Sequence, residues 1–221
     1  MKGLIVTGDD FGASPGINRG ILEAHLNGIL TSTSMLVHGA TSFAATAVAR
    51  SCPGLSLGLH LELDAVAPAR IPEQLDSQLQ RFVELVGAPP THVDSHHDVH
   101  REPRVAPQVR AWAEQQGLPL RGFSRARHLS RFYGQWGGRS HPEQISVASL
   151  LSLVDAEASE GIVELSCHPG YVEPEFKTSY AAEREIEVGT LCSAAVREGL
   201  LARDIHLIGF RDMPALATSV S

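Results

Sequence analysis

The sequence has few cysteines, few aromatic residues and no long apolar run. Its three cysteines, Cys52, Cys167 and Cys192, are an odd number and include no Cys-x-x-Cys pair, so neither a zinc ribbon nor a dithiol redox motif is predicted. No stretch is apolar for long enough to span a bilayer. The first residues lead into a predicted strand without the apolar region and cleavage site of a signal peptide. We therefore expect reduced cysteines, a cytoplasmic location and no membrane partner.

Positive charge is scarce as well. Lys and Arg total 18 against 25 Asp and Glu, for a formal net charge of −7. Because binding to a nucleic-acid backbone needs a basic face, this balance argues against nucleic acid as a partner. Hydrophobic content of 43% and charged content of 19% are typical of a globular protein. The length of 221 residues suits one α/β domain, and we expect residues 1–221 to form a single domain.

Apolar runs of strand length alternate with segments of helical periodicity about seven times. Strands are predicted at residues 3–8, 31–37, 55–61, 91–95, 118–121, 161–166 and 204–208. Helices are predicted at residues 15–27, 41–50, 72–86, 103–116, 142–160 and 181–198, followed by a C-terminal tail. This alternation implies a parallel sheet, whose active site would lie at the carboxyl ends of the strands.

Residues 122–140 depart from this alternation. The segment and its flank contain Arg121, Arg125, Arg127, Arg131 and Arg139, with the aromatic residues Phe123, Phe132, Tyr133 and Trp136. It shows no sustained period, and long loops inside compact domains are often functional. We interpret it as a lid or a wall that faces the substrate. A basic surface loop is the alternative interpretation.

Two adjacent carboxylates, Asp9 and Asp10, follow the first apolar run. Neighbouring residues on a strand point to opposite faces, so both can reach one site only where the strand has ended. Two like charges this close repel, so a counter-ion or a shared proton is expected beside them. Our hypothesis is that Asp10 holds a metal and Asp9 handles a proton. The alternative is a solvated turn, since Asp and Gly are common turn residues.

Histidines follow three other predicted strands. His60 ends the third strand, and His168 ends the sixth. At the end of the fourth lies a cluster of polar residues: Asp94, His96, His97 and His100. A single histidine at a strand end is ordinarily a packed structural residue, so the inference rests on the joint placement. A carboxylate and two imidazoles are a common ligand set for a catalytic divalent metal. The remaining histidines, His25, His38, His92, His128, His141 and His206, we assign mostly to structure or surface.

Several motifs in order along the chain carry a family resemblance. They are Asp9-Asp10-Phe11-Gly12, Gly28-Ile29-Leu30-Thr31-Ser32-Thr33, Gly58-Leu59-His60-Leu61, Asp94-Ser95-His96-His97 and Cys167-His168-Pro169. With them the chain resembles the YdjC/ChbG family of carbohydrate deacetylases, which act on N-acetylated sugars such as chito-oligosaccharides. The resemblance implies an irregular (β/α) TIM-like barrel with about seven parallel strands.

The resemblance also implies roles for the residues at the strand ends. Asp10, His60 and His96 match the ligands of one divalent metal ion, whether Zn, Mg, Mn or Co. Asp9 matches the general base, and His168 matches the general acid. The sequence departs from the family pattern at two places, and both bear on the identity of the substrate more than on the reaction. Asp98 stands where relatives often have a third consecutive histidine, and the segment after His60 is short.

The expected function is therefore metal-dependent removal of an acetyl group from a small N-acetylated carbohydrate. Two alternatives remain open at this point. One is another metal-dependent ester or phosphoester hydrolase on the same barrel, which the arginine-rich segment keeps open. The other is a non-catalytic relative that binds a sugar or a metal. A homodimer is only a general expectation.

Overall fold

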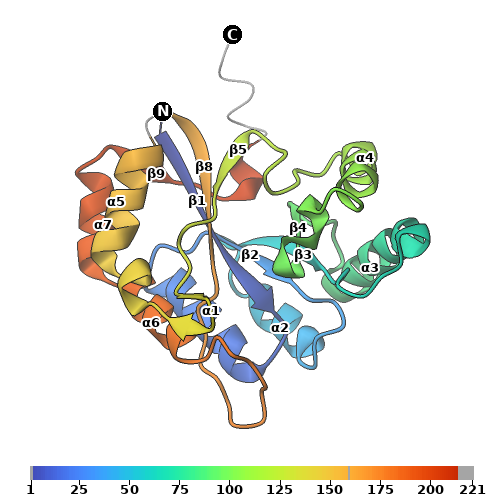
Figure 1. The fold of residues 1–221 in the computed structure, drawn as a ribbon, viewed down its shortest axis with the longest axis horizontal. Helices are drawn as coiled ribbons and strands as arrows, with labels where there is room; N and C mark the ends of the chain where they lie inside the picture. The colour runs from blue at the N-terminus through green and yellow to red at the C-terminus, as the bar shows by residue number, and fades with distance from the viewer. Residues whose placement is uncertain (1, 159, 214–221) are drawn as a thin grey trace.

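The computed structural model describes residues 2–158 and 160–213, and a curled parallel sheet lies at its centre (Figure 1). From one edge to the other, the sheet runs β4 (Val93–Ser95), β3 (Ser56–Leu61), β2 (Ser32–Met35), β1 (Lys2–Phe11), β8 (Gly161–Cys167) and β5 (Ala126–Leu129). The short strand β9 (Ile205–Leu207) pairs with the first residues of β1. All these pairs are parallel.

The barrel is open between its two edge strands. Within the described residues no strand pairing joins β4 to β5. The strand predicted at residues 118–121 is wrong: only Leu120 forms a single bridge, to Val93. Pro119 has no N–H to donate, and Gly122, at φ 72°, turns the chain away after one bridge. The predicted α/β fold with a parallel sheet is thus confirmed, whereas the TIM-like barrel is confirmed only as a curled half-barrel.

Helices cover the outer face of this sheet (Figure 1). They are α1 (Pro15–Leu26), α2 (Ser42–Ala49), α3 (Ile71–Val86), α4 (Ala106–Gln116), α5 (Val147–Glu157), α6 (Ala182–Leu191) and α7 (Ala194–Leu201). Along β1, Leu4 and Val6 belong to the main apolar core, whereas Ile5 belongs to a small cluster with Ala126 and Phe210. Because strand side chains alternate in direction, Leu4 and Val6 face the helices and Ile5 faces the barrel interior. None of the described helices is long and apolar enough to cross a membrane.

The C-terminal residues that are described are not a tail. Phe210, in a 3₁₀ helix (Phe210–Asp212), is buried and stacks on the ring of His92 with 4.0 Å between centroids. It thereby fills the end of the barrel opposite the predicted site. Residues 214–221 lie outside the described part of the chain.

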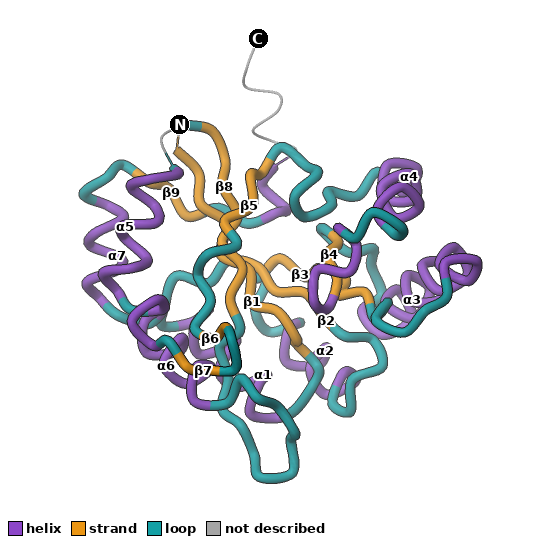
Figure 2. The backbone as a smooth tube through the Cα atoms, viewed as in Figure 1, coloured by secondary structure: helices purple, strands orange, loops and turns teal. Residues whose placement is uncertain are grey.

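Two other segments differ from the prediction. The helix expected at residues 181–198 is divided into α6 and α7, because the Leu191 carbonyl accepts the N–H of Ile29 at the point where the helix would continue. The segment 122–140 is not wholly irregular. It contains β5 and a hairpin of β6 (Gln135–Trp136) and β7 (Arg139–Ser140), seen in Figure 2. Its interpretation as a lid or a substrate-facing wall stays a prediction.

Gly20 in α1 has no side chain, which allows the helix to pack closely against the loop that carries His168. A Cβ added to Gly20 would lie 2.5 Å from the Cα atom of Gly170, and that backbone cannot move aside as a flexible side chain would. Alanine favours a helix by about 1 kcal/mol over glycine. We nevertheless expect Gly20→Ala to lower the free energy of unfolding, measured in urea, by about 1–3 kcal/mol.

The matched control is Gly189→Ala in α6, where an added Cβ meets nothing within 4 Å. This variant should be as stable as the parent or more so. Equal effects of the two substitutions would contradict the packing argument.

Candidate active site

Asp9 and Asp10 lie near the carboxyl end of β1, where the strand bulges. Gly8 pairs with Thr33 and Phe11 with Met35, so β1 has one residue more than β2 between these pairs. Asp10 has φ 69°, a left-handed conformation that short polar residues tolerate better than most. The strand has therefore not ended at the two acids, as the sequence argument required. Instead the bulge re-aims the side chains, as bulges commonly do beside active sites.

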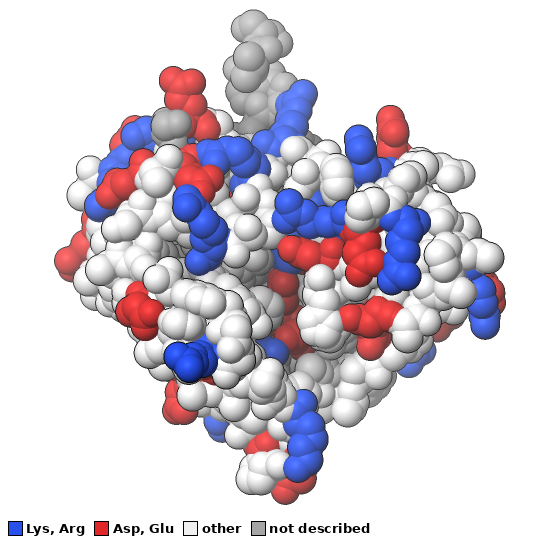
Figure 3. Space-filling model, in the orientation of Figure 1, with Lys and Arg blue, Asp and Glu red and all other residues white. Residues whose placement is uncertain are grey.

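Both carboxylates line a cavity of about 310 Å³ at the carboxyl ends of the strands. His60, His96 and His168 line the same cavity, so the structure brings all five predicted site residues together. Figure 3 shows a hollow in this face, with acidic atoms visible on its floor. His100 does not line the cavity. Its ring is buried against Ser95 Oγ, at 2.7 Å, and the carbonyl of Arg121, at 3.2 Å.

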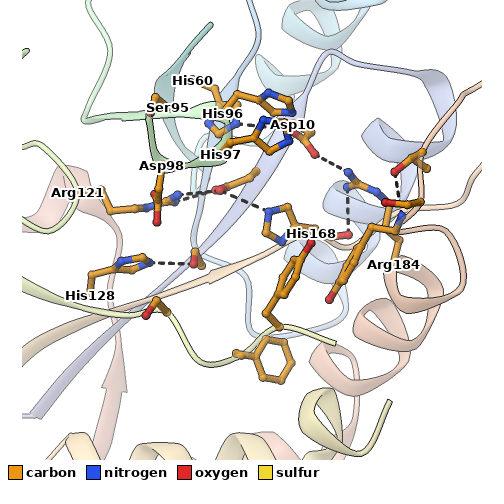
Figure 4. A pocket seen from close by; sticks show the side chains of 18 residues that line it. Asp10, His60, Ser95, His96, His97, Asp98, Arg121, His128, His168 and Arg184 are labelled. Atoms are coloured by element: carbon orange, nitrogen blue, oxygen red, sulfur yellow. Dashed lines mark hydrogen bonds and ion pairs between the residues drawn. The ribbon is translucent and has the colours of Figure 1, made fainter. Parts of the chain in front are cut away.

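The buried ring of His60 lies between the carboxylates of Asp10 and Asp94, and Figure 4 shows it beside Asp10. Its Nε2 atom is 3.4 Å from Asp10 Oδ1, and its Nδ1 atom is 2.7 Å from Asp94 Oδ1. Burial disfavours the imidazolium, but the Asp94 and Asp10 carboxylates outweigh it and hold the pKa of His60 well above its usual value. The contact with Asp94 fixes the orientation of the ring.

His96 and His97 share a carboxylate that the sequence analysis missed. Asp64 Oδ2 lies 3.0 Å from His96 Nδ1, and Asp64 Oδ1 lies 2.5 Å from His97 Nδ1. His97 and Asp98 have φ of 54° and 53°, two consecutive left-handed residues. The two histidine rings lie 3.7 Å apart, and the ring of His96 is 5.9 Å from that of His60. His96 thus resembles His60 in having a carboxylate on Nδ1, which leaves Nε2 for a ligand.

Arg121 was assigned to the arginine-rich segment, but it lies in the centre of the barrel with 1% of its surface exposed. Its Nη1 and Nη2 atoms donate to both oxygens of Asp9, each at 2.7 Å. It also contacts Asp94 Oδ2 at 2.7 Å and Glu164 Oε1 at 3.0 Å. Burial raises the pKa of Glu164 to about 7 although Arg121 opposes the shift. The guanidinium therefore holds three buried carboxylates in place.

His168 faces Asp9 from the loop after β8. Its Nε2 atom lies 3.8 Å from Asp9 Oδ2. Burial lowers the pKa of His168 to about 4, despite the nearby carboxylates, so the imidazole is neutral at neutral pH. Its backbone N–H donates to Glu187 Oε2 at 2.5 Å, and Glu187 Oε1 accepts from the Tyr180 hydroxyl at 2.5 Å.

Arg184 of α6 joins the two sides of the site. Its Nη2 atom donates to Asp10 Oδ2 at 2.5 Å, and its Nη1 atom donates to the His168 carbonyl at 3.2 Å. Burial disfavours the ionised form of Asp10, but the His60 hydrogen bond and the Arg184 charge hold the pKa of Asp10 well below its usual value. Asp10 is therefore ionised, with Oδ2 on Arg184 and Oδ1 facing His60.

One histidine assigned to structure or surface belongs to the site. His128 lines the cavity, and its Nε2 atom lies 2.9 Å from Ser166 Oγ. Residues 126–129 were expected within the irregular segment, whereas they form β5. As part of β5, His128 lies on the inner face in register with Glu164. β5 is only four residues long, so its alternation of side chains gives too weak a signal in the sequence.

The fold is that of polysaccharide deacetylases. A polysaccharide deacetylase from Bacillus cereus superimposes with a TM-score of 0.60 at 13% identity, over 95% of this chain and 92% of that one. A closer match in structure is a protein from Enterococcus faecalis that is provisionally assigned to cellobiose-phosphate cleavage. Its TM-score is 0.85 at 27% identity, over 96% of this chain and 98% of that one.

The family follows from the sequence comparisons. A family model described as YdjC-like protein matches residues 3–77 and 64–202. A chitooligosaccharide deacetylase of Serratia marcescens is 32% identical over 260 residues, which cover 96% of this chain and 99% of the relative. The chain belongs to the YdjC-like family, and the predicted resemblance is confirmed.

The comparisons also locate a difference from the relatives. The two ranges that match the family model share residues 64–77, and the alignment of 260 residues is longer than this chain of 221. The relatives therefore carry segments that this chain lacks. The break in the match falls at the segment after His60 that was predicted to be short, and Asp64 lies at its start.

Removing the central cation tests how far the site depends on it. We expect Arg121→Met to lower the free energy of unfolding by about 3–5 kcal/mol, because it removes the buried guanidinium that contacts Asp9, Asp94 and Glu164. Arg121 lowers the pKa of Asp94 and of Glu164, so without it their folded-state pKa values would rise and folding would take up protons. The deficit should therefore shrink as the pH falls from about 8 to about 5.

Chemical denaturation at the two pH values measures this dependence. The control is Arg203→Met, which removes an exposed ion pair with Asp155 and should change stability little at either pH. An Arg121→Met deficit that stays constant with pH would contradict the assigned role of Arg121.

Proposed function

We propose that this protein is a metal-dependent hydrolase that removes the acetyl group from an N-acetylated amino sugar such as a chito-oligosaccharide. The observation that carries the proposal is the bulge in β1, which directs Asp9 and Asp10 into one cavity with His60 and His168. The similarity to the Serratia marcescens chitooligosaccharide deacetylase supports it.

The proposed metal ligands are Asp10, His60 and His96. Asp10 Oδ1 and His60 Nε2 are 3.4 Å apart, close to the separation of about 3.3 Å between two ligands of one zinc ion. Both histidines have a carboxylate on Nδ1, a common outer contact of metal-binding histidines. When bound, the metal would polarise the amide carbonyl and lower the pKa of water.

Another group of potential ligands is less suitable. Asp9, His60 and Asp94 have ligand atoms within 4.8 Å of one another. Arg121, however, occupies both oxygens of Asp9 and one of Asp94. A cation is already present at that position, so we place the metal on the Asp10 side of His60.

Asp9 is the proposed general base and His168 the proposed general acid. Asp9 accepts a proton from the attacking water, and Arg121 keeps the carboxylate in a fixed orientation. His168 starts neutral because of its lowered pKa, so it must receive a proton before it can donate one. The 3.8 Å separation from Asp9 offers a short route for that proton to the sugar nitrogen. The C–N bond then breaks, and acetate and the amine are released.

Tyr133 is the proposed contact for the sugar ring. It stacks on Tyr180 at 4.6 Å and lies edge-on to His168 at 5.7 Å, with 37% of its surface exposed at the cavity. An aromatic ring in this place can cover the apolar face of a sugar. This is the role expected for the segment 122–140 as a wall of the site.

The charges of the cavity favour an acetamide over a phosphoester. Among the described residues that line it, the Arg and Lys side chains are Arg121 and Arg184, and both are paired with carboxylates. Neither is left to bind a phosphate dianion. The alternative of a phosphoester hydrolase therefore has less support than deacetylation.

Acetate release from diacetylchitobiose tests the reaction and the metal together. The protein should release acetate, lose activity on complete chelation and regain it when one of Zn, Mg, Mn or Co is added back. Asp10→Asn should lose activity and bind the metal more weakly, because it removes an anionic ligand. Turnover that survives both metal removal and Asp10→Asn would sink the proposed metal role.

His168→Ala separates proton transfer from metal binding. Loss of a general acid should lower kcat by about 10²–10⁴-fold, while metal content, measured by elemental analysis, stays at the level of the parent. His206→Ala, at an exposed position on β9, should change neither quantity. Loss of metal in His168→Ala would mean that His168 is a ligand and that its proposed role is wrong.

A further inference from the structure

Three polar side chains form a line that ends at the cavity and that the mechanism above does not use. Arg101 Nη1 lies 3.2 Å from His128 Nδ1, and His128 Nε2 lies 2.9 Å from Ser166 Oγ. Figure 4 shows His128 on the wall of the cavity with its dashed contact. Arg101 is exposed, whereas His128 and Ser166 both line the cavity.

The chemistry of these groups fixes the direction of the hydrogen bonds. A guanidinium can only donate, so His128 Nδ1 must accept from Arg101. Burial, with the charges of Arg121 and Arg101, lowers the pKa of His128 to about 3, and the ring is neutral. A neutral imidazole that accepts at Nδ1 carries its proton on Nε2. His128 therefore donates to Ser166, and Ser166 Oγ accepts.

The hydroxyl hydrogen of Ser166 must then point elsewhere. In the part of the chain that the structure describes, His128 is the hydrogen-bond partner of this hydroxyl, and no acceptor for its hydrogen is present. Ser166 lies on the same face of β8 as Glu164, and His168 follows in the loop after the strand. Glu164 holds Arg121, and His168 faces Asp9. A hydrogen-bond donor is thus presented to the cavity beside the proposed catalytic groups.

We propose that Ser166 donates a hydrogen bond to an oxygen atom of the bound amino sugar and that Arg101 and His128 set the direction of that bond. The identity of the ligand rests on the proposed function. Ser166 is then a specificity-determining residue, and Arg101 and His128 are positioning residues. The donor suits a hydroxyl, ring or carbonyl oxygen and disfavours an ammonium group, which itself can only donate.

The direction of the hydrogen bonds from Arg101 through His128 to Ser166 can be tested through the tautomer of His128, independently of activity. Long-range proton–nitrogen NMR correlations distinguish a proton on Nε2 from one on Nδ1. We expect the Nε2–H form in the parent protein and in Arg101→Lys, which keeps a donor. In Arg101→Met, which removes the donor, the Nδ1–H form should become populated. An Nδ1–H tautomer in the parent would overturn the inference.

Kinetics with diacetylchitobiose test the contact with the sugar. Ser166→Ala and Arg101→Met should each raise KM by roughly three- to tenfold, the effect of one neutral hydrogen bond, with kcat within about twofold. Ser166→Thr keeps the hydroxyl and Arg101→Lys keeps the donor, so both should restore the KM of the parent. A KM in Ser166→Ala equal to that of the parent would overturn the contact.

Binding of the sugar can be measured even if the protein does not turn it over. If the parent protein releases no acetate, the proposed reaction fails, and calorimetric titration of diacetylchitobiose into the parent and Ser166→Ala replaces the KM comparison. Weaker binding by roughly three- to tenfold in the variant would still support the contact. Equal binding by the two proteins, or no binding to the parent, would overturn it.

Discussion

The site depends on one buried cation, the guanidinium of Arg121. It binds Asp9, Asp94 and Glu164, which come from β1, β4 and β8. These strands bring their carboxylates into the interior of the half-barrel, where uncompensated charges are costly. Arg121 directly follows Leu120, which forms a single bridge to Val93. The short segment that fails to close the barrel therefore also places the Arg121 guanidinium among the three carboxylates.

Two acids can be adjacent in this site because they have different partners. Asp9 is held by Arg121 and faces His168, whereas Asp10 is held by Arg184 and faces His60. The bulge makes this division possible, since a regular strand would direct the two side chains to opposite faces. The proposed base and the proposed metal ligand thus lie side by side without sharing a counter-charge.

The sequence predicted the strands and site residues that have strong local signals. The apolar runs of β1, β3 and β8 and the polar residues that end them led to Asp9, Asp10, His60 and His168. The residues that were missed have no such signal. Arg121 and Asp64 act on groups far away in the sequence, and their charges are ordinary for loops. His128 was missed because β5 is short, and the bulge was missed because strand periodicity cannot reveal an extra residue.

The central claim is that a metal binds between Asp10 and His60 while Arg121 keeps Asp9 free of it. The most direct measurement is anomalous scattering from crystals grown with zinc. The account predicts one strong peak bonded to Asp10 Oδ1 and His60 Nε2, with His96 as a third ligand and Arg121 still paired with Asp9. A peak held instead by Asp64 and the Nδ1 atoms of His96 and His97, whose ligand atoms lie within 4.8 Å of one another, would contradict it.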